Sequence, residues 1–361
     1  MTERQAMERA LELALEGWGR VAPNPLVGAV LLRDGIVVGE GFHAEFGGAH
    51  AEVAALQQCG DPRGATCVLN LEPCTHDAKT PPCTDALIGA GVRRVVYAVP
   101  DPDPVAGGGG ERLKAAGIEV AWGLQRERAA ALNAPFLWAR CRADLPFVAV
   151  KVATSLDGFL ADSDGRSRWI SSEESRDWVH WLRAGFDALA VGRHTAVTDD
   201  PALTVRGSVA PRIPPIRVVF AGGGNLPVDL TLLATANEVP SMIFVRAGAT
   251  EPTRAALAGT GVTVHPADDL GKALRTLREV GIESVLVEGG GTVVTALLEA
   301  DLVDRLYWVQ APIWLGQGQR AFGDRTARGL GDVRAWTAIE RRPLGPDTLL
   351  VLDRELCLLE S

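Results

Sequence analysis

Short apolar segments typical of strands alternate with segments of helical periodicity along the whole chain. In the first part, helices are predicted up to about Glu16, from about His50, over 83–90 and over 124–140, and strands over 27–32, 67–71 and 94–99. In the second part, a helix is predicted over 172–183, with Ser171 and Glu174 as its capping box, and strands over 147–153, 187–192, 216–220, 241–246 and 284–288. This alternation predicts α/β layers rather than a β-sandwich or a helix bundle.

A polar, proline-bearing segment, CRADLPF at 141–147, separates the last helix of the first part from a new apolar strand. Such a segment is typical of a domain boundary. The 361 residues are enough for two domains of ordinary size. We therefore expect one domain at residues 1–145 and a second at residues 146–361.

The chain is acidic, with a formal net charge of −9 and a pI near 5.3. Proteins that bind nucleic acid by neutralising phosphates carry a basic surface, so we expect no nucleic-acid partner. No apolar run approaches the ~20 residues of a membrane span, and the first helix lacks the regions of a signal peptide. The six unevenly placed cysteines are typical of reduced cytosolic thiols. We expect a cytoplasmic protein with no membrane partner, and a homo-oligomer.

The most informative residues are a histidine, a glutamate and two cysteines. His50 and Glu52 lie two positions apart at a predicted helix start, while Cys74 and Cys83 each follow a proline. One imidazole and two thiolates are ligands that zinc prefers, and three protein ligands leave a coordination position open for water, as in catalytic zinc sites. Such a water can attack a ring carbon that bears an amine.

In this interpretation Glu52 is not a ligand. It takes a proton from the water and delivers it to the ring nitrogen and the departing ammonia, as in zinc deaminases with H-x-E and P-C-x-x-C motifs. Here eight residues separate the two cysteines instead of two. Taken one at a time, His50 could cap a helix and the cysteines could be core thiols. Their joint occurrence favours a metal site.

The other histidine and cysteines near these motifs, and the glycine run at 107–110, are not predicted to bind the metal. His76 could replace a cysteine as ligand, but three ligands suffice, so we expect it to contact substrate or support the ligands. The run at 107–110 is predicted to be a flexible loop before a helix. The remaining cysteines have no partner at ligand spacing and are predicted to be buried apolar residues: Cys59, Cys67, Cys141 and Cys357.

A glycine-rich turn, VLVEGGGTVVTALLEA at 285–300, joins a predicted buried strand to a helix. Backbone amides at a helix N-terminus attract phosphate, and glycines allow a dinucleotide to approach closely. The segment does not match G-x-G-x-x-G, so on its own a plain tight turn is the better interpretation.

Four ordered motifs in the first part resemble the deaminase domain of the bifunctional riboflavin biosynthesis deaminase/reductase family. They are PNPLVGAV (23–30), GFHAEFGGAHAE (41–52), LEPCTHDAKTPPC (71–83) and DPDPVAGGG (101–109). The resemblance implies a cytidine-deaminase-like three-layer α/β domain, zinc on His50, Cys74 and Cys83, and Glu52 as acid/base. It also implies a phosphorylated pyrimidine as the small-molecule substrate, contacted by Asn24, His43, His76, Lys79 and Asp101.

Segments of the second part resemble the reductase domain of the same family, which is similar to dihydrofolate reductase in fold. They are KVATSLDG (151–158), residues 167–206 and VEGGGTV (287–293). The resemblance implies reduction of a ribosyl group to ribityl by NADPH, with Lys151 and Glu288 as the catalytic candidates. The implied cofactor contacts are Ala153, Trp169, Thr195, Asp199, Gly290, Gly291 and Thr292. The implied substrate contacts are Ser167, Arg183, Leu203, Arg206 and Glu288.

Several positions depart from the family pattern. Asp103 stands where the family usually has Asn, and a carboxylate there would repel a phosphorylated substrate unless it is protonated or faces away. Ala221 and Gly222 replace a common Asp-Ser pair, and no residue is identified that reads the extra phosphate of NADPH. Further departures are Ala29 for Cys, Ala78 for Gly and Arg305 for Glu.

Simpler interpretations stay open for single residues. Lys79 could be an ordinary solvated lysine, Arg183 could offset a helix dipole, and Trp169 could be a core aromatic residue. Two alternative functions concern the whole chain. Deamination of a base within RNA shares the zinc chemistry, but the acidic balance and the lack of basic and aromatic patches disfavour it. Alternatively, one domain has lost catalysis and serves as a scaffold, although the residues for both reactions are present.

Overall fold

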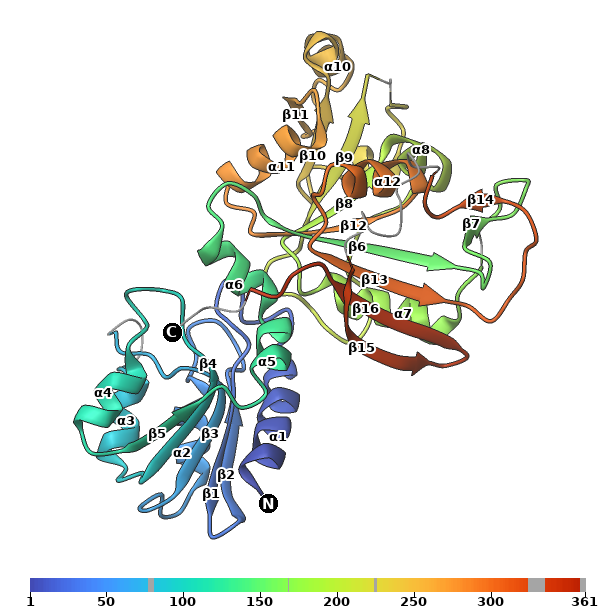
Figure 1. Ribbon diagram of the computed structural model, residues 1–361. Coiled ribbons are helices and arrows are strands. Elements are labelled where there is room, and N and C mark those ends of the chain that lie inside the picture. The colour runs from blue at the N-terminus through green and yellow to red at the C-terminus, as the bar shows by residue number, and fades with distance from the viewer. Residues whose placement is uncertain (77–80, 168, 224–225, 324–334, 358–361) are drawn as a thin grey trace. The chain divides into compact units, whose positions relative to one another are not determined.

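The computed structural model describes residues 1–76, 81–167, 169–223, 226–323 and 335–357 (Figure 1). The chain divides into two compact units, one of Met1–Cys141 together with Leu356 and Cys357, and one of Arg142–Glu355, so the first boundary lies four residues before the expected one. Cys357, near the other end of the chain, packs against a core cluster of the first unit. No helix in these ranges is long and apolar enough to cross a membrane.

The first unit is built on one five-stranded sheet with the order β2-β1-β3-β4-β5. Strand β1 is antiparallel to β2 and β3, whereas β3, β4 and β5 run parallel. The strands are β1 (Gly28–Arg33), β2 (Ile36–Phe42), β3 (Thr66–Leu71), β4 (Arg94–Val99) and β5 (Glu119–Trp122). The helices are α1 (Glu3–Leu15), α2 (Ala51–Gln58), α3 (Cys83–Gly89), α4 (Gly109–Ala115), α5 (Arg126–Leu132) and α6 (Ala134–Cys141).

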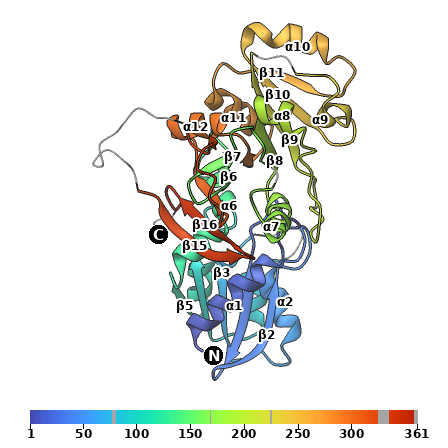
Figure 2. The same ribbon diagram turned by 90° about the vertical axis from the view of Figure 1, so that its right-hand side faces the viewer.

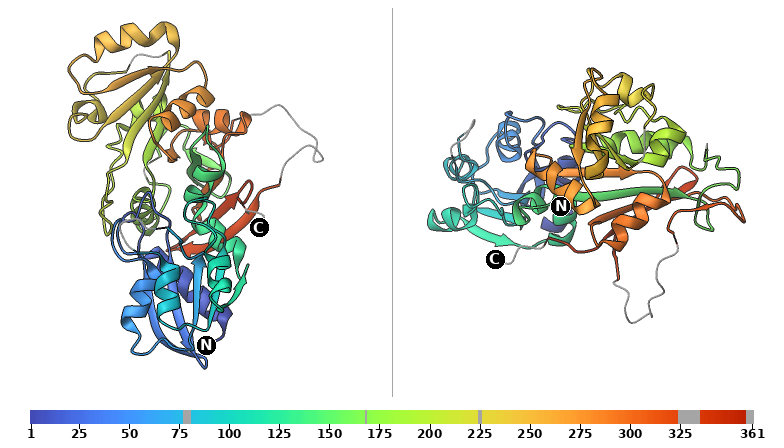
Figure 3. Two further views of the ribbon diagram at one scale, coloured as in Figure 1. Left: turned by 90° about the vertical axis from the view of Figure 1, so that its left-hand side faces the viewer. Right: turned by 90° about the horizontal axis from the view of Figure 1, so that it is seen from above.

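Helices cover both faces of this sheet and make three layers. Alternate side chains of a strand point to opposite faces, so Val30 packs in the core beneath α1, α5 and α6, and Leu31 in the core beneath α2, α3 and α4. Figure 3 shows α1, in blue at the N-terminus, beside the strands. Its first turn is closed by a capping box between Thr2 and Gln5. The unit is therefore a three-layer α/β domain, as expected.

The helix predicted over 124–140 is two helices, α5 and α6, separated at Asn133. The buried Asn133 side chain accepts a hydrogen bond from the Leu26 amide (2.8 Å) and donates one to the Leu26 carbonyl (2.9 Å). Asn70 on β3 donates to the same carbonyl (2.8 Å). These buried amides hold the segment before β1, and this long-range pairing outweighs the helical periodicity that predicted one helix.

The second unit has a nine-stranded sheet with the order β11-β10-β9-β8-β12-β6-β13-β16-β15, and a small β14-β7 pair. Its first seven strands are parallel, and the β15–β16 hairpin, red in Figure 2, adds an antiparallel edge. The strands are β6 (Phe147–Thr154), β7 (Phe159–Ala161), β8 (Ala188–Gly192), β9 (Ile216–Gly222), β10 (Ser241–Val245), β11 (Thr263–Pro266), β12 (Ser284–Glu288), β13 (Arg305–Gln310), β14 (Gln319–Arg320), β15 (Thr337–Leu344) and β16 (Asp347–Asp353).

The helices of this unit connect the parallel strands. They are α7 (Glu173–Arg183), α8 (Arg193–Asp199), α9 (Thr231–Ala234), α10 (Thr250–Ala256), α11 (Leu270–Glu279) and α12 (Gly291–Glu299), with a 3-10 turn at Ala247–Ala249. The predicted capping box of α7 is wrong by one residue. Ser172, not Ser171, is the N-cap and accepts from the Ser175 amide, because Asp347 binds the Ser172 amide at 2.8 Å and fixes the chain there.

Candidate active sites

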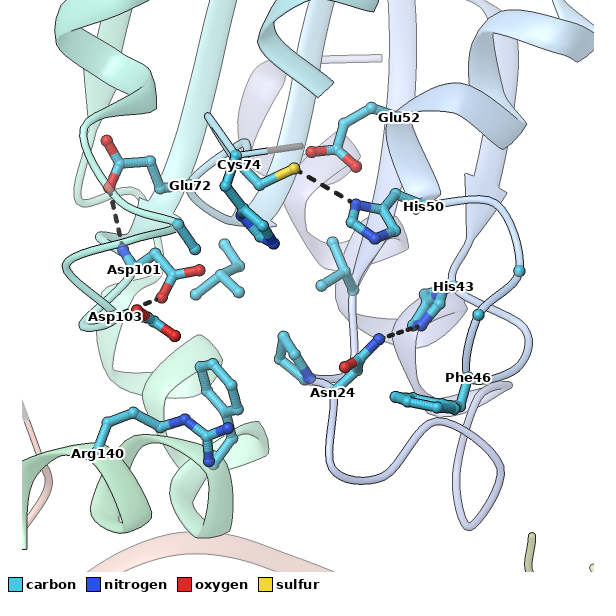
Figure 4. Close-up of a pocket in the computed structure, with 18 residues that line it drawn as sticks. Asn24, His43, Phe46, His50, Glu52, Glu72, Cys74, Asp101, Asp103 and Arg140 are labelled. Carbon is cyan, nitrogen blue, oxygen red and sulfur yellow. Dashed lines mark hydrogen bonds between the residues drawn. The ribbon is translucent and has the colours of Figure 1, made fainter. Parts of the chain in front are cut away.

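Three metal-binding side chains meet in the first unit. His50 is the N-cap residue of α2, Cys74 lies in the loop after β3, and Cys83 begins α3. Their donor atoms all lie within 4.8 Å of one another, and Figure 4 shows His50 and Cys74 side by side. His50 Nδ1 is 3.2 Å from Cys83 Sγ and 3.6 Å from Cys74 Sγ. One imidazole and two sulfurs at this separation fit a zinc ion, with a coordination position left open.

The two sulfurs are also linked to each other. The hydrogen bond between the two side chains lowers the pKa of Cys74 and raises that of Cys83, and the Cys83 backbone amide also donates to Cys74 Sγ at 3.4 Å. By contrast, burial alone raises the pKa of the core residue Cys67. Cys74 and Cys83 therefore lie within reach of one metal ion together with His50, whereas Cys67 packs in the core.

Glu52 lies in the first turn of α2, beside this cluster, and is only 3% exposed. Burial raises the pKa of its carboxyl group to about 7 in the metal-free protein. A carboxyl group with this pKa exchanges a proton readily near neutral pH. The structure thus brings together the four residues that the H-x-E and cysteine motifs single out.

Asn24 and His43 form a hydrogen-bonded pair at the same pocket. The Ala49 carbonyl can only accept, so His43 Nδ1 carries the proton and donates to it at 3.0 Å. His43 Nε2 then accepts from Asn24 Nδ2 at 3.1 Å, which leaves the Asn24 carbonyl oxygen available to a ligand. Burial lowers the pKa of His43, so the imidazole stays neutral.

Asp101 lines the pocket, and burial raises its pKa to about 6. Glu72, for which the sequence predicts no role, accepts from the Asp101 amide at 3.0 Å and from the Gly110 amide at 2.8 Å. Asp103 also lines the pocket, and its Oδ1 accepts from the Val105 amide at 2.9 Å. The side-chain oxygen of an asparagine, the usual residue of the family at this position, could accept the same hydrogen bond. Asp103 therefore forms the same turn as an asparagine would.

The prediction of a flexible loop at 107–110 is wrong for Gly109 and Gly110, which form the buried first turn of α4. A Cβ atom on Gly109 would lie 1.9 Å from the Pro73 carbonyl oxygen. Only glycine therefore lets α4 approach the residue that precedes Cys74. Sequence alone does not show a contact between residues this far apart in the chain.

The pocket is about 290 Å³ and includes His76, whose buried Nδ1 has no hydrogen-bond partner in the described part of the chain. An unsatisfied buried nitrogen in a pocket indicates a ligand contact. Lys79 lies outside the described residues. Sequence reasoning missed Phe46, Phe136 and Arg140, which also line the pocket. Figure 4 shows Arg140 at the end away from Cys74 and Glu52, and its guanidinium lies 4.4 Å from the centre of the Phe136 ring.

Two of the four cysteines predicted to be buried are not. Cys59 and Cys67 are core residues, whereas Cys141 is exposed and Cys357 half-buried. The sulfur atoms of Cys141 and Cys357 lie 2.9 Å apart. Cys141 ends α6, at the last residue of the first unit before the chain enters the second, and so is not enclosed by either core.

A second group of charged residues lies at the carboxyl ends of the parallel strands of the second unit. Lys151 on β6 and Glu288 on β12 are directly paired across the two strands. Arg183, at the end of α7, binds Glu288 with both Nε (2.5 Å) and Nη2 (3.0 Å) and donates from Nη1 to the Thr204 carbonyl (3.0 Å). Burial alone would raise the pKa of Glu288, but Arg183 and Lys151 lower it, while burial lowers the pKa of Lys151.

The glycine turn lies next to this group. Gly290, Gly291, Thr292 and Thr195 line a cavity of about 470 Å³ at the carboxyl ends of β8 to β12. The Gly290 amide donates to Thr195 Oγ1 at 2.9 Å, which fixes the turn before α12. Glycines and helix amides at this edge of a parallel sheet fit a dinucleotide.

The other residues implied for the reductase lie outside the lining of this cavity. Ala153 is two positions beyond Lys151 on β6, and Asp199 ends α8. Trp169 is 68% exposed, with Arg176 stacked 4.4 Å from its ring centre, so it is no core residue. The remaining implied substrate contacts are placed as follows: Ser167 accepts from the Ile170 amide, Leu203 is buried with a φ of 45°, and Arg206 Nη2 lies 3.4 Å from His180 Nε2.

Comparison with known proteins matches both units to described families. Residues 1–99 match the cytidine and deoxycytidylate deaminase zinc-binding region, and residues 146–350 match the RibD C-terminal domain. The chain is 37% identical over 354 residues to the riboflavin biosynthesis protein RibD of Aquifex aeolicus, covering 98% of each chain. The RibD of Escherichia coli is 39% identical over 374 residues, covering 98% of this chain and 99% of the relative.

Among solved structures, one neighbour is a diaminohydroxyphosphoribosylaminopyrimidine deaminase/5-amino-6-(5-phosphoribosylamino)uracil reductase from Thermotoga maritima. It has a TM-score of 0.82 and 34% identity, and the match covers 97% of this chain and 98% of that chain. These matches confirm the expected fold class, a cytidine-deaminase-like domain followed by a dihydrofolate-reductase-like domain. By its sequence, its two domains and its structural neighbours, this chain belongs to the RibD family of riboflavin biosynthesis proteins.

Proposed function

We propose that the first domain removes an amine by hydrolysis from a diaminopyrimidinone that carries a phosphoribosylamino group. The observation that carries this proposal is the cluster of His50, Cys74 and Cys83 beside the buried carboxyl group of Glu52. A zinc ion bound there supplies Lewis acidity and a water activated for attack on the ring carbon. The carbon–nitrogen bond to the amine breaks, and ammonia leaves with a carbonyl in its place.

In this proposal Glu52 moves the protons of the reaction. Its carboxyl group accepts a proton from the attacking water, passes it to the ring nitrogen, and protonates the leaving amine. Burial favours this role because bulk water does not reach the site to exchange these protons in place of the carboxyl group. Four described residues hold the ring around the reacting carbon: Asn24, His43, His76 and Asp101. Lys79 remains a proposed phosphate contact from the family resemblance.

We propose that the second domain reduces the ribosyl group of the deaminated product, 5-amino-6-(5-phosphoribosylamino)uracil, to ribityl. NADPH supplies a hydride, which forms a carbon–hydrogen bond at C1′ of the opened sugar while a proton adds to the attached nitrogen. Lys151 is suited to deliver that proton because burial lowers its pKa. Glu288 stays ionised beside Arg183 and orients Lys151.

The remaining assignments concern the ligands of this domain. Gly290, Gly291 and Thr292 are the proposed diphosphate contacts, since they form the turn and first residues of α12. Thr195 supports the turn. Further proposed cofactor contacts are Ala153, Trp169 and Asp199, and the proposed substrate contacts are Ser167, Arg183, Leu203, Arg206 and Glu288. Two of these are arginines that lie on either side of His180 and are suited to the substrate phosphate.

We also propose that the protein acts in the cytoplasm as a homo-oligomer. The six cysteines are unevenly placed along the chain, which is typical of reduced thiols in a reducing compartment. Light scattering of the purified protein measures its mass in solution. A mass equal to that of one chain would contradict the proposed oligomer.

The proposed function is tested by incubating the purified protein with the phosphoribosylated diaminopyrimidinone, with and without NADPH, and determining product masses. Without NADPH, we expect replacement of an amine by a carbonyl oxygen. With NADPH, we expect that product to gain a pair of hydrogen atoms. Absence of the first mass change would refute the deaminase, and absence of the second with purified deaminated substrate would refute the reductase.

A further inference from the structure

The order of the strands determines how a dinucleotide must run across the second domain. The proposed reaction centre, Lys151 and Glu288, lies at β6 and β12, and the glycine turn follows β12. Apart from Gln319 on β14, which pairs with β7, the lining of the cavity runs from that turn past β8, β9 and β10 to the end of β11. A nicotinamide at this reaction centre would place its adenosine half over the ends of β8 to β11.

The lining of the cavity fits this direction. Its apolar floor suits an adenine ring and consists of Phe220, Phe244, Ala267, Leu270 and Ala273. The basic residues that line it are Arg193 and His194 at the start of α8 and Arg246 after β10. Its acidic residues, Asp268 and Asp269, already accept from the backbone amides of Ala247 (3.0 Å) and Lys272 (2.7 Å).

Arg246 lies over the turn that ends β9. Its backbone amide donates to the Gly222 carbonyl at 2.9 Å, and its Nη1 is 4.0 Å from the position a Cβ atom of Gly223 would take. Within the part of the chain that the structure describes, no carboxylate pairs with Arg246. Ala221 and Gly222 also line the cavity but have no polar side chain, so the end of β9 supplies only backbone to a ligand there.

We propose that Arg246 binds the 2′-phosphate of NADPH and so sets the preference of this enzyme for NADPH over NADH. The inference rests on the proposed reductase function. A guanidinium group can hold two oxygens of a phosphate at once, and its position between the ends of β9 and β10 is where the adenosine ribose must lie. Neighbouring strands are about 4.8 Å apart, so a side chain after β10 must extend across that distance to contact a ribose over the end of β9. The Arg246 side chain does so, since it lies over Gly223.

Calorimetry of the full-length protein with two probes tests the proposal without any turnover. Adenosine 2′,5′-bisphosphate and adenosine 5′-monophosphate differ only by the 2′-phosphate. We expect Arg246→Ala to weaken binding of the bisphosphate about 10- to 100-fold, the usual loss for a hydrogen bond to a charged group, and to leave the monophosphate within about twofold. The ratio of kcat/KM for NADPH to that for NADH should fall by the same factor.

Arg254→Ala is the matched control, because Arg254 is an exposed arginine on α10 that pairs with Glu251 and does not line the cavity. Its ratio of affinities should equal that of the wild type. The assignment would be overturned if Arg246→Ala left the ratio of affinities for the bisphosphate and the monophosphate unchanged. It would also be overturned if Arg193→Ala abolished the preference for the bisphosphate while Arg246→Ala had no effect. If neither probe binds and NADPH is not oxidised, the reductase proposal fails as well; binding of both probes without preference refutes only the role of Arg246.

Discussion

Replacement of Glu52 by glutamine should abolish deamination while the fold and the metal site persist. Glutamine has nearly the same shape as glutamate, so the 3% exposed position stays filled, but an amide cannot exchange a proton near neutral pH. Loss of one general acid–base group lowers a rate about 10²- to 10⁴-fold. Because this carboxyl group serves several proton transfers in a buried site, we expect the upper end, a loss of about 5 kcal/mol in transition-state stabilisation.

The assay is release of ammonia from the diaminopyrimidinone substrate, together with zinc content and NADPH oxidation on the deaminated substrate. Zinc content and reductase turnover should equal those of the wild type. Glu111→Gln is the matched control, since that side chain is 80% exposed on α4 and should leave the rate unchanged. Deamination by Glu52→Gln within about tenfold of the wild type would refute the assigned role, since even the smallest expected loss is about 10²-fold.

Three further changes test other parts of the structure. Gly109→Ala should destabilise the first domain by about 1–3 kcal/mol in urea unfolding and lower zinc affinity, because the new Cβ would overlap the Pro73 carbonyl; an unaltered midpoint and affinity would contradict the close packing. Arg140 is a guanidinium group at the end of the pocket away from Glu52 and is suited to the substrate phosphate, so Arg140→Ala should raise KM for the phosphorylated substrate with little change in kcat. An equal rise with the dephosphorylated substrate would show that Arg140 does not bind the phosphate. Because the pKa of Glu288 is lowered in the folded protein, its ionised form stabilises the fold above the unfolded pKa of about 4.3, and this stability is lost as the pH falls. The unfolding midpoint of the wild type should therefore drop more steeply below pH ~5 than that of Glu288→Gln. Identical slopes would contradict the ion pair with Arg183.

Local signals were enough to predict the alternation of strands and helices and the centre of the deaminase site. His50 and Glu52 lie at a helix start, and Cys83 begins the next predicted helix, so the sequence predicted that these residues face one pocket from two helix starts. The glycine turn after β12 was visible for the same reason, because strand, turn and helix follow one another directly.

The features that sequence did not predict depend on contacts between distant segments. Glu72 gains its role from amides at Asp101 and Gly110, and the break at Asn133 comes from its bonds to Leu26, more than a hundred residues away. Arg246 looks like an ordinary surface arginine in the sequence. Its position over the turn after β9 appears only when neighbouring strands are paired.

Metal content and its removal test the central claim most directly. The purified protein should contain one zinc ion per chain, bound by His50, Cys74 and Cys83. A strong chelator should remove the ion and abolish deamination, zinc should restore it, and NADPH oxidation on the deaminated substrate should continue throughout. Protein that contains no tightly bound divalent metal, or that deaminates its substrate at an undiminished rate after chelation, would contradict the account.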